Sequence, residues 1–183
     1  MKKYFIRYKP FLFFLGTFFL TYIVLTFLYQ EYLNSFGENK LDTITRLVGE
    51  NTKQVLQWFD SGATVEENKL DPHIKLFYNR RYMARIIEGC NGISVVILFA
   101  SFVVAFSGKL KPTLLFIFGG SLFIYLLNVL RIGVLCVLMF NFPNQKQLLH
   151  GVLFPLFIYG VLFILWLIWV NKFSKYASKT TKE

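Results

Sequence analysis

The 183-residue sequence contains few residues of the kinds that cross-link a small protein or bind metals, with 2 cysteines and 2 histidines. Two cysteines, Cys90 and Cys136, are too few for a disulfide framework, although they leave open a single bond to each other. His73 and His150 lie far apart in the chain, and neither belongs to a Cys and His cluster with metal-ligand spacing. We therefore predict neither a metal centre nor a bound cofactor.

Acidic residues are also scarce: 10 Asp and Glu stand against 20 Lys and Arg, a net charge of +10. Residues 30–89 hold 8 basic and 9 acidic residues and are nearly neutral, so the basic excess lies elsewhere. Ten of the other 12 basic residues lie in the N-terminus (Lys2, Lys3, Arg7, Lys9), a short link (Lys109, Lys111) and the C-terminal tail (Lys172, Lys175, Lys179, Lys182). This distribution argues against a nucleic-acid partner. It is the positive-inside pattern of a membrane protein with both termini in the cytoplasm.

Long uncharged runs dominate the rest of the chain, which is 55% hydrophobic with a mean hydropathy of +0.50. Runs of about 18–20 apolar residues are long enough to cross a bilayer. We predict an all-α polytopic membrane protein with about four transmembrane helices and one large outer segment between the first two. The first run follows basic residues and lacks a small-residue cleavage site, which favours a retained signal anchor. The predicted order is a cytoplasmic tail at 1–9, a span at 10–29, the outer segment at 30–89, spans at 90–107, 113–141 and 150–170, and a cytoplasmic tail at 171–183.

The third apolar run is too long for a simple span. From Pro112 to Phe142 a straight helix would measure about 45 Å, against about 30 Å of hydrocarbon. The sequence leaves two alternatives open. A tilted helix would bury Arg131 more deeply, whereas a kink near Gly133 would leave residues 132–142 at or beyond the outer boundary.

The outer segment has the pattern of a folded unit. Apolar residues recur at helical spacing from Leu41 to Phe59, and Asp42 or Thr43 is suited to begin such a helix. Residues 74–88 mix arginines with aromatic and aliphatic side chains, which favours an interfacial helix or short strands leading into the second span.

Three polar residues reach a similar outer level from three different spans. Cys90 and Arg131 each lie 19 residues from the cytoplasmic end of their span, which is about 28 Å of helix. His150 lies 22 residues from the end of the last span, or about 33 Å. Short connections favour antiparallel neighbouring helices, so we expect the three side chains to face one site.

The chemistry of this trio is that of nucleophilic catalysis. A cysteine thiolate is a strong nucleophile, and a helix N-terminus, where we expect Cys90, favours the thiolate form. His150 is suited to take up and return a proton, and Arg131 is suited to hold a developing oxyanion or an acidic substrate group. Gly89 and Gly92 are expected to leave room for a substrate backbone. Each of the three residues also has a purely structural explanation that needs no catalysis, because polar side chains collect at membrane boundaries.

The ordered set resembles the exosortase/archaeosortase family of multi-span cysteine transpeptidase-like enzymes. The residues that carry the resemblance are Cys90-Asn91-Gly92 at the head of the second span, Asn128-x-x-Arg131 in the third and His150 at the start of the last. The family usually has Ser-Gly after its cysteine, whereas this chain has Asn-Gly. The resemblance covers about residues 80–170, and the short chain is similar to the compact exosortase F form.

The resemblance implies a catalytic set of Cys90, Arg131 and His150, supported by Asn91, Gly92 and Asn128. Asn128 lies on the helical face of Arg131, and it could orient the arginine or donate a hydrogen bond. The implied activity is that of a cysteine peptidase or transpeptidase of the plasma (inner) membrane, with its site facing the periplasm. The implied partners are exported client proteins with a C-terminal sorting tail, and a lipid or glycan acceptor.

Two other functions are compatible with the spans. A non-enzymatic membrane assembly factor or chaperone would use the arginine and histidine for helix contacts. A transporter or a lipid-handling protein would bind an anionic group at Arg131, but the lack of a second intramembrane charge and of paired broken helices argues against transport.

Overall fold

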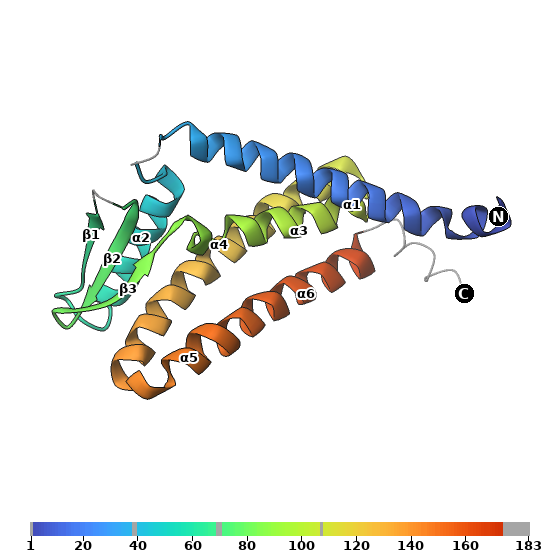
Figure 1. The fold of residues 1–183 in the computed structure, drawn as a ribbon. Coiled ribbons are helices and arrows are strands. Elements are labelled where there is room, and N and C mark those ends of the chain that lie inside the picture. Colours follow the sequence, from blue (N-terminus) through green and yellow to red (C-terminus); the bar gives the residue numbers. More distant parts are fainter. Residues whose placement is uncertain (1, 38–39, 69–70, 107, 174–183) are drawn as a thin grey trace.

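The computed structural model describes residues 2–37, 40–68, 71–106 and 108–173. The chain is mostly helical, which confirms the predicted helical membrane fold, and a small sheet forms part of the outer segment (Figure 1). The elements, in order, are α1 (Lys2–Asn34), α2 (Thr43–Gln57), β1 (Thr64–Asn68), β2 (His73–Tyr78), β3 (Arg81–Ile86), the 3₁₀ turn η1 (Glu88–Cys90), α3 (Ile93–Ala105), α4 (Leu110–Asn141), the 3₁₀ turn η2 (Pro143–Gln145), α5 (Lys146–Leu148), the π-helical turn η3 (Leu149–Leu153) and α6 (Phe154–Lys172).

Three helical segments among the described residues are long and apolar enough to cross a membrane: Tyr8–Asn34, Leu110–Asn141 and Pro143–Lys172. The second predicted span, at residues 90–107, is shorter than expected, because α3 has 13 residues, or about 20 Å of helix. Cys90 and Asn91 do not extend it: Gly92 precedes the helix with a left-handed φ of 86° and separates it from η1.

α3 is the centre of the helix packing, since α1, α4 and α6 all contact it. The ring of Phe14 on α1 lies 4.5 Å from that of Phe106, just after α3. On α4, Gly120 leaves room for the buried ring of Phe99, which a Cβ at this position would overlap. The outer faces of α1 and α6 expose apolar side chains, as helices that face lipid do.

α4 is α-helical without interruption through Gly133. The glycine serves a close approach of α2 to α4, because a Cβ on it would lie 2.8 Å from Cγ1 of Val55. A second contact joins the two helices where Asn51 Nδ2 donates a hydrogen bond to the Tyr125 hydroxyl at 2.7 Å. The part of α4 that exceeds the thickness of a bilayer is therefore packed against the outer segment.

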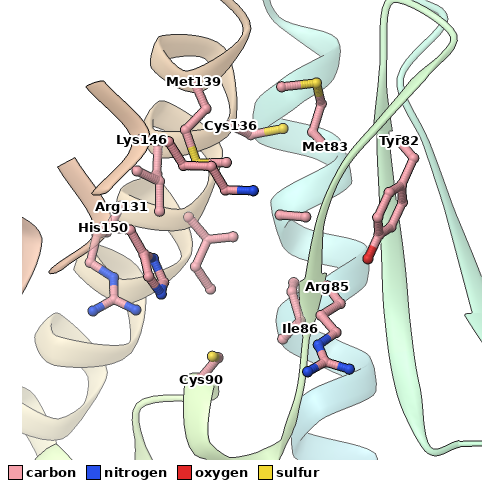
Figure 2. A pocket seen from close by; sticks show the side chains of 13 residues that line it. Tyr82, Met83, Arg85, Ile86, Cys90, Arg131, Cys136, Met139, Lys146 and His150 are labelled. Carbon is pink, nitrogen blue, oxygen red and sulfur yellow. The ribbon is translucent and has the colours of Figure 1, made fainter. Parts of the chain in front are cut away.

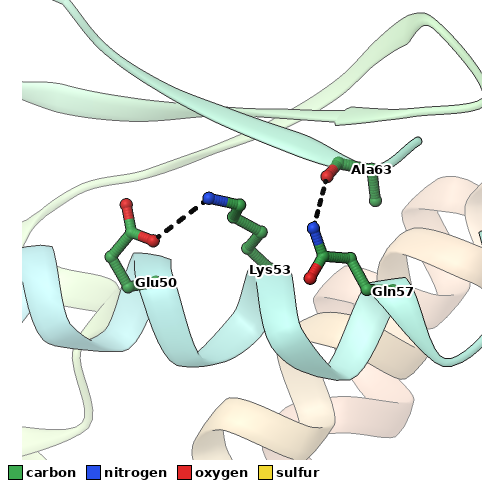
Figure 3. Close-up of polar contacts among 4 residues, drawn as sticks. All are labelled: Glu50, Lys53, Gln57 and Ala63. Carbon is green, nitrogen blue, oxygen red and sulfur yellow. Dashed lines mark hydrogen bonds and ion pairs between the residues drawn. The ribbon is translucent and has the colours of Figure 1, made fainter. Parts of the chain in front are cut away.

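The predicted helix of the outer segment is confirmed as α2, and Asp42 caps it by accepting a hydrogen bond from the Thr45 N–H at 2.9 Å. Near its C-terminus, Gln57 Nε2 donates to the Ala63 carbonyl at 3.3 Å and holds the loop before β1, and an exposed Lys–Glu pair lies one turn earlier (Figure 3). The first contact orders the chain entering the sheet, whereas the exposed pair contributes little to stability.

Residues 74–86 form strands rather than an interfacial helix. The sheet has the antiparallel order β1-β2-β3. Asn79 and Arg80, both with positive φ, form the two-residue turn between β2 and β3, as the right-handed twist of a hairpin favours. Asp60 Oδ2 accepts a hydrogen bond from the Asn79 N–H at 2.8 Å and ties this turn to the end of α2. β3 then leads directly to η1 and Cys90.

The long helices run between two opposite ends of the molecule (Figure 1). The start of α1, the link between α3 and α4, and the last turn of α6 lie toward one end. The outer segment and the turns that join α4 to α6 lie at the other end.

Candidate active site

A pocket of about 270 Å³ lies between β3, η1, α4 and the turns that precede α6. Cys90, Arg131 and His150 all line it, so the structure brings the three predicted residues to one cavity from three different elements (Figure 2). Its lining consists of Tyr82, Met83, Ala84, Arg85, Ile86, Cys90, Arg131, Ile132, Leu135, Cys136, Met139, Lys146 and His150.

Cys90 ends the 3₁₀ turn η1 and is half-buried. Its N–H donates to the Ile87 carbonyl at 2.8 Å, which closes the turn. Figure 2 shows the side chain directed into the pocket. The sequence placed Cys90 at the N-terminus of the second span; the structure places it two residues before Gly92, the residue that precedes the first turn of α3.

Arg131 lies on α4 and is partly buried. Its Nε atom is buried, and among the described residues it has neither a hydrogen-bond partner nor a carboxylate within ion-pair distance. The Arg131 and Cys90 side chains line the same pocket (Figure 2). An unpaired guanidinium that faces a cavity is available to an anion or to a developing oxyanion.

His150 lies in the π-helical turn η3, where the chain turns from α5 into α6, and it is exposed. Turns of this type occur frequently at functional sites, because the wider turn redirects a side chain out of the regular helix. Its imidazole points toward the pocket on the side of Arg131 (Figure 2).

Asn128 and Gly92 hold the backbone of Cys90 rather than the thiol. Of the two roles expected for Asn128, the structure shows a hydrogen bond: its Nδ2 donates to the Cys90 carbonyl at 2.9 Å. A Cβ on Gly92 would lie 3.1 Å from Cγ of Asn128, so the space at this glycine is filled by Asn128 and not left for a substrate. Gly89 differs, because nothing lies within 4 Å of the position of its missing Cβ.

Asn91 has a buried side chain, 2% exposed, and its side-chain hydrogen bonds join it to three other elements. Its Nδ2 donates to the Tyr29 hydroxyl at 2.7 Å and to Thr45 Oγ1 at 3.1 Å. Its Oδ1 accepts from the N–H of Ile93 at 3.0 Å, in the first turn of α3. The residue beside the cysteine is therefore a junction between α1, α2 and α3.

Sequence reasoning missed two further basic residues of the pocket, Arg85 on β3 and Lys146 on α5. Together with Arg131 and His150 they make the lining basic, and no acidic side chain from the described part of the chain lines this pocket. Lys146 is the only charged residue between positions 132 and 171, which was the signal available in the sequence. Arg85 carried no such signal, because its position depends on the fold of the sheet.

Cys136 packs as a small hydrophobic residue and is 1% exposed on the apolar wall of the pocket. Both cysteines are free thiols. Among the described residues, no three His, Cys, Asp or Glu side chains gather as metal ligands do.

No curated protein and no solved structure matches the chain. A family model does match: the one described as Transmembrane exosortase (Exosortase_EpsH) covers residues 7–170. The matched range begins in α1, includes the whole outer segment and every residue of the pocket, and ends in α6. It takes in well over half of the chain, and it confirms the family expected from the ordered Cys, Arg and His residues. The chain therefore belongs to the transmembrane exosortase family.

Proposed function

We propose that the protein is a membrane-embedded cysteine peptidase or transpeptidase that cleaves the C-terminal sorting tails of exported proteins. The observation that carries the proposal is the pocket that Cys90, Arg131 and His150 line from three separate elements. Family membership supports a sorting protease or transpeptidase at the level of the family. The identity of the reacting residues rests on the chemistry of the pocket.

The first step is attack on the client. The apolar tail of the client lies beside the helices and presents a backbone carbonyl at the pocket. His150 takes the proton of the Cys90 thiol, and the sulfur forms a bond to the carbonyl carbon. Negative charge then develops on the carbonyl oxygen, where the unpaired guanidinium of Arg131 stabilises it.

The second step is release of the tail. The tetrahedral intermediate collapses, the C–N bond breaks, and His150 returns its proton to the leaving amine. The client remains bound to Cys90 as a thioester. Water, or an amine or hydroxyl group of a lipid or glycan acceptor, attacks the thioester carbonyl; the new bond forms, the C–S bond breaks, and the thiol is restored.

We further propose that the protein lies in the plasma (inner) membrane with the pocket on the periplasmic side. Basic residues at the start of the chain, at Lys109 and Lys111, and at Lys172 belong to the end that holds the start of α1 and the last turn of α6. The pocket belongs to the opposite end, together with the nearly neutral outer segment. Under the positive-inside rule, this distribution directs the pocket outward.

Co-expression with an epitope-tagged client tests the proposal. The client carries a short motif, an apolar span and a basic end, and its size is followed by immunoblotting in cells with wild-type enzyme, Cys90→Ala or Cys136→Ala. Processing should stop in Cys90→Ala and persist in Cys136→Ala, whose thiol has no part in the proposed chemistry. Processing at the wild-type rate in Cys90→Ala cells would contradict the proposal and favour a non-enzymatic assembly factor.

A further inference from the structure

The hydrogen bonds around Asn91 give α1 and α2 a role that the sequence does not assign to them. α1 carries the features of a signal anchor, and α2 lies in the outer segment. We propose that Tyr29 of α1 and Thr45 of α2 are positioning residues that hold Cys90 in its reactive place through Asn91. This inference rests on the proposed function, because it concerns the position of the proposed nucleophile.

The side chain of Asn91 contributes its amide hydrogens and its oxygen to this junction. The amide group donates to the Tyr29 hydroxyl at 2.7 Å and to Thr45 Oγ1 at 3.1 Å. The oxygen accepts from the Ile93 N–H at 3.0 Å. Loss of one of these partners would leave a buried polar atom without a hydrogen bond, which is unfavourable in free energy. The three contacts therefore fix the position of the amide.

A second contact holds the peptide bond that joins Cys90 to Asn91. Asn128 on α4 donates to the carbonyl of Cys90 itself at 2.9 Å. The chain directly after the Cα of Cys90 is therefore fixed twice, at the Cys90 carbonyl and at the side chain of Asn91. A displacement of α1 or α2 would move Asn91 and, with it, the backbone that directs the thiol toward the pocket.

α1 packs against α3 with one set of atoms and positions Asn91 with another. α1 is packed along α3 by ring contacts such as Phe18 with Phe102, whose centroids lie 4.7 Å apart. The Tyr29 hydroxyl takes no part in those ring contacts, and its removal leaves the apolar span intact. Thr45 is fully buried in the first turn of α2, where Asp42 caps its N–H, so its hydroxyl has a defined direction.

Two pairs of matched variants test the proposal in full-length enzyme reconstituted in nanodiscs. Tyr29→Phe removes the acceptor hydroxyl, and Tyr32→Phe is its control on the next turn, where the ring stacks on Tyr29. Thr45→Val removes the acceptor with little change of shape, and Thr45→Ser retains it. Three quantities are measured: capture of a tagged client, the rate of thioester formation at Cys90, and the rate at which iodoacetamide modifies Cys90, followed by peptide mass spectrometry.

We expect Tyr29→Phe and Thr45→Val to slow thioester formation about two- to twelvefold, the value of one buried hydrogen bond. Client capture should stay unchanged. Cys90 alkylation should slow in the same two variants, because the thiol spends less time directed toward the basic lining of the pocket. Tyr32→Phe and Thr45→Ser should match the wild type. In an Asn91→Ala background, Tyr29→Phe should add no further loss, since both changes act through one bond.

Equal alkylation rates in Tyr29→Phe and Tyr32→Phe would overturn the proposal, whatever the client does. So would a loss of client capture with an unchanged thioester step. A wild-type enzyme that forms no thioester would contradict the proposed function instead, and the alkylation rates would still decide whether Tyr29 and Thr45 position Cys90.

Discussion

Replacement of Gly92 by alanine should disturb the backbone next to Cys90 without changing the thiol itself. Gly92 has a φ of 86°, and a Cβ on it would lie 3.1 Å from Cγ of Asn128. Alanine at this position therefore has two costs. It must adopt a left-handed conformation, and it must displace the side chain that donates to the Cys90 carbonyl.

The two costs can be estimated separately. The left-handed conformation costs a residue other than glycine about 1–2 kcal/mol. Loss of the hydrogen bond from Asn128 costs about 1 kcal/mol. Gly92→Ala should then lower the free energy of unfolding by about 2–3 kcal/mol. In an Asn128→Ala background the second cost is already present, so Gly92→Ala should cost only the conformational part, about 1–2 kcal/mol.

Reversible unfolding by SDS in mixed micelles, followed by tryptophan fluorescence, measures these differences. Gly89→Ala is the matched control, because Gly89 lies next to the same cysteine with open space at its Cβ position and no left-handed φ. Unfolding free energies that do not differ between Gly92→Ala and Gly89→Ala would refute the reasoning. The same cost of Gly92→Ala with and without Asn128 would refute the steric part of it.

Three further predictions follow from the packing and the pocket. Arg131→Gln should slow thioester formation by about 100- to 1,000-fold, the usual value of one oxyanion contact, while client capture persists; an unchanged rate would exclude Arg131 from the chemistry. Gly133→Ala should destabilise the contact of α2 with α4 by about 1–3 kcal/mol in the same unfolding assay, and Val55→Ala should restore the stability; failure of that rescue would contradict the close approach. Gly120→Ala should cost about as much, because its Cβ would overlap a buried ring of α3, whereas Gly119→Ala, which meets nothing within 4 Å, should stay within experimental error of the wild type.

The long apolar helices and the meeting of three polar residues at one pocket could be predicted from the sequence because both depend on local rules. Uncharged runs define the spans, and a constant rise per residue relates position in a span to depth. By this reasoning Cys90, Arg131 and His150 were expected at one level, and all three line one pocket. α2 was also predictable, since its apolar spacing and its Asp42 cap lie within a short stretch of sequence.

The supporting contacts could not be predicted, because they join residues far apart in the chain. Asn91 bonds to Tyr29, 62 residues away, and Asn128 to Cys90, 38 residues away. Nothing local in the sequence marks these partners. α3 is shorter than predicted for a related reason. Gly92 packs against Asn128 with a left-handed backbone, so α3 begins only after Gly92 and does not include Cys90. Arg85 reaches the pocket only because residues 73–86 form a hairpin.

The thioester on Cys90 is the most direct test of the account. Purified full-length enzyme is mixed with a client that carries its sorting tail, the reaction is stopped with acid within seconds, and the peptide that contains Cys90 is analysed by mass spectrometry. We predict a thioester adduct on Cys90 that carries the part of the client upstream of the cleaved bond, with the mass of that part less one water. Hydroxylamine should release the adduct, and Cys90→Ala should lack it. A client that is cleaved while Cys90 stays unmodified, and that Cys90→Ala cleaves equally well, would contradict the account.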